Sequence, residues 1–154
     1  MRWYLAARYG RREEMLRYAE QLRAAGHEVS SRWINGSHQI PDSEEDVSGE
    51  EAARFAKEDL EDMIDSDGII SFTEAPRSGV GNRGGRHVEF GFGLGLAVVT
   101  KAAGDMYGLV IIGHRENVFH WFPEAMFYPT WGEFLARLIV ATNKANEAVG
   151  SADA

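Results

Sequence analysis

The stretch NRGGRHVEFGFGLGLAVV, residues 82–99, fits both a strand and a helix. Which of the two it forms decides the fold. Apolar residues occupy every second position from Val88 to Leu96, which is the period of a β-strand. With the helical period, the same residues surround the axis on most sides, which is typical of a buried helix. The pattern alone leaves both interpretations open.

The neighbouring segments favour the helix. Compact apolar runs at Gly68–Phe72 and Leu109–Gly113 indicate two strands. A parallel pair of strands needs a crossover, which is usually a helix, and Gly85–Ala103 is the only segment available for it. Each internal glycine costs such a helix about 1 kcal/mol relative to alanine. We therefore expect the helix backbone to approach a neighbour or a ligand closely.

The rest of the chain alternates between strand and helix patterns. Capping boxes at Ser48 and Thr130 mark two helix starts, and Gly26 is suited to end an earlier helix. The predicted strands and helices are Arg2–Ala7, Arg11–Ala25, His27–Ile34, Ser48–Asp65, Met126–Tyr128 and a last helix after Thr130. This order predicts a three-layer α/β fold of the Rossmann- or flavodoxin-like kind, with a mostly parallel sheet of four or five strands and helices on both faces.

Length and composition narrow the class of protein. We expect residues 1–150 of the 154 to form a single domain and residues 151–154 a disordered tail. The absence of cysteine excludes disulfides and thiolate metal sites. The longest apolar run is about half a membrane span, and no signal peptide is evident, so we expect a cytoplasmic protein. The net charge of −8 argues against binding of polymeric nucleic acid.

A candidate site lies where ligands bind in such sheets, beyond the carboxyl ends of the strands. Glu89 stands near the start of the predicted crossover helix. The preceding RGGR, residues 83–86, offers backbone N–H groups from Gly84 and Gly85 and two guanidinium groups, which form a plausible anion cradle. The motif alone also fits a glutamate whose role is only electrostatic.

Four segments together resemble the nucleoside 2-deoxyribosyltransferase family, including the 2′-deoxynucleoside 5′-monophosphate N-glycosidases. The segments are WYLAAR (3–8), EDLEDMIDSDGIISF (58–72), GGRHVEFGFGLGLAV (84–98) and GHRENVFHW (113–121). The resemblance implies that Glu89 is the nucleophile, that Asp59 points into the site and that Tyr4 faces the sugar. It places His120 in a segment that reaches a neighbouring subunit's site.

The resemblance also implies a set of substrate-binding residues: Arg8, Ser78, Arg83, Gly84, Gly85, Arg86 and His120. Some of these positions depart from the family pattern. The loop before Glu89 is longer and richer in arginine than in relatives, with Ser78 and Arg83 where they carry Ser or Asp, and Arg8 replaces a small polar residue. The departures leave the sugar and phosphate contacts open, but not the nucleophile.

The function implied is cleavage or transfer at the N-glycosidic bond of a (2′-deoxy)nucleoside or its 5′-monophosphate, through a covalent glycosyl-enzyme. Two alternatives stay open: a non-catalytic nucleotide-binding module on the same fold, and a hydrolase of a modified ribonucleotide.

The implied partners are a small-molecule nucleoside or nucleotide and a further copy of the chain, in a homodimer or higher homo-oligomer. We expect no membrane partner and no cofactor, because the glycines of residues 91–95 lack the dinucleotide-binding spacing. No metal is expected, since His27, His38 and His114 lack the spacing of metal ligands.

Overall fold

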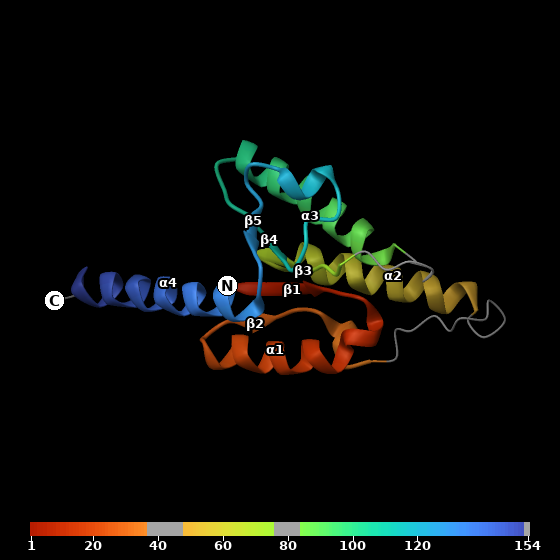
Figure 1. The fold of residues 1–154 in the computed structure, drawn as a ribbon, viewed down its shortest axis with the longest axis horizontal. Coiled ribbons are helices and arrows are strands. Elements are labelled where there is room, and N and C mark those ends of the chain that lie inside the picture. The colour runs from red at the N-terminus through yellow and green to blue at the C-terminus, as the bar shows by residue number, and fades with distance from the viewer. Residues whose placement is uncertain (37–47, 76–83, 153–154) are drawn as a thin grey trace.

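The computed structural model describes residues 1–36, 48–75 and 84–152, and Figure 1 shows how their elements are arranged. Five strands form one sheet in the order β2-β1-β3-β4-β5, and every neighbouring pair is parallel. The strands are β1 (Arg2–Ala6), β2 (Glu28–Val29), β3 (Gly68–Phe72), β4 (Gly108–Ile112) and β5 (Met126–Tyr128). The parallel sheet predicted from the alternation of elements is confirmed.

Helices cover both faces of the sheet. The four are α1 (Arg12–Ala24), α2 (Gly49–Ile64), α3 (Gly85–Ala102) and α4 (Trp131–Ala152). In Figure 1, α1 lies on one side of β1, whereas α2 and α3 lie on the other. The start of α4 packs against α1: the Trp131 ring stacks on the Tyr18 ring, with centroids 4.3 Å apart. The rest of α4 extends past the sheet. This is the expected three-layer α/β fold.

The ambiguous stretch is a helix, as its position between two parallel strands predicts. One of its internal glycines has a packing reason, since a Cβ at Gly93 would lie 2.6 Å from Cγ2 of Ile69 on β3. A Cβ at Gly91 or Gly95 would meet nothing within 4 Å. The glycines predicted a close approach of the helix backbone to a neighbour. The structure shows this approach at Gly93, where α3 packs against β3. Nothing in the structure explains the other two.

The prediction of a strand over His27–Ile34 is wrong beyond Val29. Ser30 leaves the strand, and η2 (Arg32–Ile34) is a 3-10 helix. Side chains satisfy the backbone of β1 in place of a longer β2: Ser31 Oγ accepts from the Leu5 N–H at 2.6 Å, and Trp33 Nε1 donates to the Leu5 carbonyl at 2.8 Å. These contacts are not visible in a pattern of β-forming residues.

Other boundaries differ by a residue or two. β4 begins and ends one residue earlier than the predicted Leu109–Gly113. It ends at Ile112 because Gly113 takes a φ of +115°. Ser48 and Thr130 accept hydrogen bonds from the backbone N–H groups of Glu51 and Glu133, as their capping boxes predict. The helix α4 reaches Ala152, and residues 153–154 of the expected tail lie outside the described residues. Among the described helices, none is both long and apolar enough to cross a membrane.

Candidate active site

Tyr4 and Glu89 meet between β1 and α3. The Tyr4 hydroxyl donates a hydrogen bond to Glu89 Oε1 at 3.0 Å, although the two residues stand 85 positions apart. Tyr4 is fully buried, and its backbone is fixed by parallel pairing of β1 with β3. The other carboxylate oxygen, Glu89 Oε2, is also buried and has no hydrogen-bond partner among the described residues. One oxygen is thus held, and the other is left for a further interaction.

Burial controls the protonation of Glu89. Loss of solvent, followed by repulsion from Asp59, raises the pKa of Glu89 from 4.5 to about 8. The Tyr4 hydrogen bond and the charge of Arg86 act in the opposite direction but do not cancel the shift. The residue as a whole is partly exposed, yet its carboxylate oxygen is not, and the pKa follows the carboxylate. A pKa of about 8 favours the protonated form of Glu89 at neutral pH.

Asp59 lies near this pair, on α2. Burial raises the pKa of both Glu89 and Tyr4, and the negative charge of Asp59 raises both further; for Tyr4 the charge of Glu89 contributes more than that of Asp59. One of its oxygens, Oδ1, is buried. The structure therefore brings together the three residues for which the sequence predicts catalytic roles. The roles themselves remain predictions.

Arg86 is buried at the start of α3 and is paired with a residue that the sequence analysis did not single out. Its Nη2 donates to Glu116 Oε1 at 2.6 Å, and both side chains are nearly inaccessible. Two further nitrogens of the guanidinium, Nε and Nη1, are buried and have no hydrogen-bond partner in the part of the chain that the structure describes. Part of the predicted anion cradle is therefore already neutralised by an internal carboxylate, while two donor atoms are unused.

The other predicted substrate-binding residues fall into three groups. Arg8 follows β1 and forms an ion pair with Glu74, which follows β3, at 3.0 Å. Gly84 caps α3 with a φ of +74°, which favours glycine, and Gly85 is the first residue of the helix. Ser78 and Arg83 lie outside the described residues.

His120, predicted to bind substrate, is buried among side chains of its own chain. It belongs to η4 (Val118–Trp121), and its side chain is 1% exposed, packed edge-on against Phe90 with centroids 4.7 Å apart. The His120 ring is thus buried within its own chain, and the reach of this segment to a neighbouring subunit stays a prediction. The exposed apolar residues of the segment are Val118, Phe119 and Trp121.

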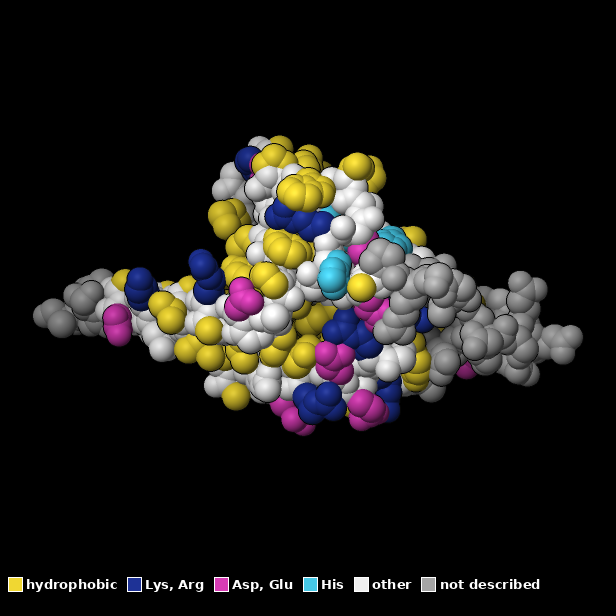
Figure 2. Space-filling model, viewed as in Figure 1, with side chains coloured by type: hydrophobic (Ala, Val, Ile, Leu, Met, Phe, Trp, Pro, Cys, Tyr) yellow, Lys and Arg dark blue, Asp and Glu magenta, His cyan; other side chains and the backbone are white. Residues whose placement is uncertain are grey.

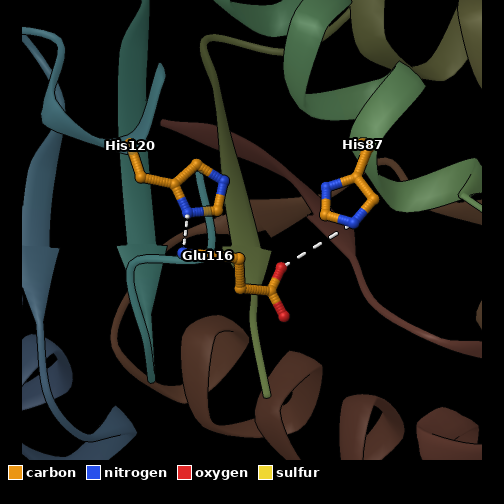
Figure 3. Close-up of side chains that lie close together, drawn as sticks. All are labelled: His87, Glu116 and His120. Carbon is orange, nitrogen blue, oxygen red and sulfur yellow. Dashed lines mark hydrogen bonds and ion pairs between the residues drawn. The ribbon is translucent and has the colours of Figure 1, made fainter. Parts of the chain in front are cut away.

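His87, Glu116 and His120 form a compact group with potential metal-ligand atoms within 4.8 Å of one another, and Figure 3 shows Glu116 between the two imidazoles. Its bonding does not suit a metal. His120 Nδ1 accepts from the Glu116 N–H at 3.1 Å, and Asn117 Nδ2 stands 3.3 Å from His120 Nε2. The Asn117 amide is oriented by accepting from the Phe119 N–H.

A neutral imidazole has a single lone-pair nitrogen, and in His120 this is Nδ1, which accepts from the Glu116 N–H and is not available to a cation. The Glu116 carboxylate already neutralises Arg86. Burial lowers the pKa of His120, so the ring is neutral. The group is a hydrogen-bonded cluster, and we assign no metal to it.

Sequence reasoning missed Glu74 and Glu116. Both follow strands at the carboxyl edge of the sheet, where ligand-binding residues were expected after Phe72 and after Gly113. That placement was the available signal. It does not identify Glu116 by itself, because Glu116 and Arg86 stand 30 positions apart and their pairing leaves no local sequence pattern.

Comparison with known proteins gives a similar fold. No family model matches the sequence, and no curated protein matches it. A 2-deoxyribosyltransferase from the psychrotolerant bacterium Bacillus psychrosaccharolyticus is similar in structure, with a TM-score of 0.60 and 19% identity over 90% of this chain and 96% of that one.

Two further structures align with lower scores. A CMP N-glycosidase from Clostridium botulinum has a TM-score of 0.46 and 20% identity over 91% of this chain and 99% of that one. A conserved protein from Enterococcus faecalis V583 has a TM-score of 0.45 and 15% identity over 92% of this chain and 87% of that one. The chain therefore has the fold of the Bacillus enzyme.

Proposed function

We propose that this protein belongs with the nucleoside 2-deoxyribosyltransferases and cleaves or transfers the N-glycosidic bond of a (2′-deoxy)nucleoside or its 5′-monophosphate. The observation that carries the proposal is the buried Glu89 carboxylate: Oε1 accepts from Tyr4, and Oε2 has no hydrogen-bond partner within residues 1–36, 48–75 and 84–152. The fold shared with a 2-deoxyribosyltransferase supports it.

The proposed chemistry begins with attack of Glu89 Oε2 on C1′ while the C1′–N bond breaks. The bonding electrons leave with the base, which takes a proton from Asp59, and the sugar becomes an ester of Glu89. Water or a second base then attacks C1′ and gives a proton to the Asp59 carboxylate, the ester bond between C1′ and Glu89 breaks, and the Glu89 carboxylate is restored. Attack by water makes the enzyme a hydrolase, and attack by a base makes it a transferase.

The raised pKa of Glu89 is compatible with this order of reaction steps. Burial and repulsion from Asp59 raise the pKa of Glu89 to about 8, so Glu89 has a proton to give up at neutral pH. Ionisation of Glu89 with transfer of its proton to Asp59 gives one nucleophile and one acid. Tyr4 keeps its proton, because burial and the charge of Glu89 raise its pKa well above the usual value, and it orients Oε1 as a donor.

The substrate we favour carries a negative charge near the start of α3. One turn before Glu89, Arg86 presents Nε and Nη1, which are both buried and have no hydrogen-bond partner among the residues described. A phosphate oxygen is a strong acceptor for such donors, and the start of a helix adds a favourable dipole. We therefore place the nucleoside 5′-monophosphates ahead of the free nucleosides.

A substrate panel tests the proposal. The folded protein is incubated with deoxynucleosides, their 5′-monophosphates and the matching ribonucleotides, with and without a free acceptor base, and base release is followed by chromatography. Rapid quenching and intact-protein mass measurement should show one added glycosyl group, absent in Glu89→Gln. Saturable nucleotide binding without release of base from any compound would contradict the proposal and support a binding module instead.

A further inference from the structure

Glu116 joins three separate parts of the chain. Its Oε1 accepts from Arg86 Nη2 on α3 at 2.6 Å and from the backbone N–H of Glu74 after β3 at 3.1 Å. Its Oε2 lies 3.9 Å from His87 Nε2, also on α3 (Figure 3). Glu116 itself follows β4, so one nearly buried carboxylate links the loops after two strands to the first turn of the helix.

A second contact lies on the other side of Glu89. The backbone N–H of Glu116 donates to His120 Nδ1, and the His120 ring packs against Phe90. The segment from Glu116 to His120 thus touches α3 immediately before Glu89, through Arg86 and His87, and immediately after it, through Phe90.

We propose that Glu116 is a positioning residue that holds the first turn of α3, and with it the Glu89 carboxylate, in the orientation that meets Tyr4. This inference rests on the proposed function for its catalytic consequence, but its structural part stands apart from it. Glu116 acts through Arg86, His87 and His120, and no contact between Glu116 and a substrate is required.

A carboxylate is needed at this position for two reasons. It is the charged group that the structure shows within ion-pair distance of the buried Arg86 guanidinium, and a buried charge without its partner is strongly destabilising. One of its oxygens also accepts from two donors in different segments. Glutamine keeps the shape and one acceptor oxygen but removes the charge, so Glu116→Gln separates the two reasons.

The experiment compares Glu116→Gln with Glu124→Gln in the full chain. Glu124 pairs with Lys101 near the other end of α3, at the surface, so the control removes an ion pair from the same helix away from the site. Amide hydrogen exchange is followed at His87 and Val88, whose N–H groups donate to the Gly84 carbonyl at 2.9 and 3.3 Å. Kinetic constants are measured on the substrate that the panel identifies.

For Glu116→Gln we expect exchange at these amides to become about 100-fold faster or more and kcat to fall much more than KM changes. For Glu124→Gln we expect neither effect. If Glu116→Gln does not fold, Glu116→Asp keeps the charge but is one methylene too short to reach both donors, and the same two measurements apply to it.

The outcomes separate this inference from the proposed function. Wild-type exchange rates at His87 and Val88 in both Glu116 variants would overturn it, whatever their activity. Faster exchange with unchanged kcat would show that Glu116 is merely structural and would also overturn it. A wild-type protein that releases no base from any compound would defeat the proposed function, while the exchange measurement would still decide whether Glu116 fixes the helix.

Discussion

The two ends of the sheet differ in what they bury. At the carboxyl end of the strands lie ionisable side chains with few accessible atoms: Tyr4, Glu89, Arg86 and Glu116. At the opposite end, a hollow of about 700 Å³ lies between the strand starts and α4. Its lining is mostly apolar, and Figure 2 shows hydrophobic side chains gathered along α4 on this face.

One end of the sheet has a cavity, and the other has the reactive groups. The hollow is lined by Trp3, Met106, Met126 and Phe134, with Arg137 and Lys144 as its charged members, and no described lining residue is an acid or a histidine. It offers volume but no pair of groups that could exchange a proton. The carboxyl end offers a carboxylic acid whose pKa is raised to about 8 and an orienting phenol, which mark a reactive site better than volume does.

The largest effect expected from this contrast is on turnover. Glu89→Gln should lower kcat by about 10⁴-fold or more, because the amide cannot form the glycosyl ester. The control is Glu133→Gln, which changes an exposed glutamate near the start of α4 and should leave kcat within about twofold of wild type. Turnover of the favoured substrate is the measurement, and a Glu89→Gln enzyme with wild-type kcat would move the chemistry elsewhere.

At the apolar end the expected effect is on stability. Phe134→Ala should lower the free energy of unfolding by about 3–5 kcal/mol, because the ring packs against Trp3, Tyr128 and Trp131. Denaturant unfolding measures it. Turnover per folded molecule should stay unchanged. A matching loss of kcat would show that the two ends are coupled and would break the comparison.

The buried acid should also make stability depend on pH. Between its usual pKa of 4.5 and its folded pKa of about 8, Glu89 is protonated in the folded state and ionised in the unfolded state. Raising the pH through this window therefore removes stability, by about 1.4 kcal/mol per pH unit. The glutamine of Glu89→Gln cannot ionise. The free energy of unfolding of this variant, relative to that of the wild type, should therefore increase from pH 5 to pH 8. Parallel curves for the two proteins would show that Glu89 is ionised when folded.

The smallest effects concern the glycines of α3. Gly93→Ala should destabilise the fold by about 1–3 kcal/mol, because the new methyl group would overlap Ile69 on β3. Gly91→Ala meets open space and should stabilise it by up to about 1 kcal/mol through helix propensity. Thermal or denaturant unfolding of both variants gives the comparison. A stabilising Gly93→Ala together with a destabilising Gly91→Ala would place the sheet contact at Gly91.

The sequence predicted the architecture where each element could be recognised from its neighbours. The helix at 85–102 followed from the need for a crossover, although its period favoured a strand equally. The second strand was overpredicted because Ser31 and Trp33 satisfy β1 through side chains, which no local pattern reveals.

The candidate site was predicted in part. Tyr4, Asp59 and Glu89 came from resemblance, and the structure brings them together without testing their roles. The pairing of Arg86 with Glu116 and the burial of His120 were not predictable, because they depend on side chains that meet only after β3, α3 and β4 have packed. Spacing identifies which residues can approach the sheet edge, but not which of them neutralise one another.

The contact between Tyr4 and Glu89 has a consequence for the order of folding. It closes a loop of 85 positions, and it needs β1 paired with β3 and α3 docked on that pair. Long-range contacts of this kind form late, after local helices are in place. Recovery of activity during refolding should therefore report the last docking step, whereas helical signal should return earlier.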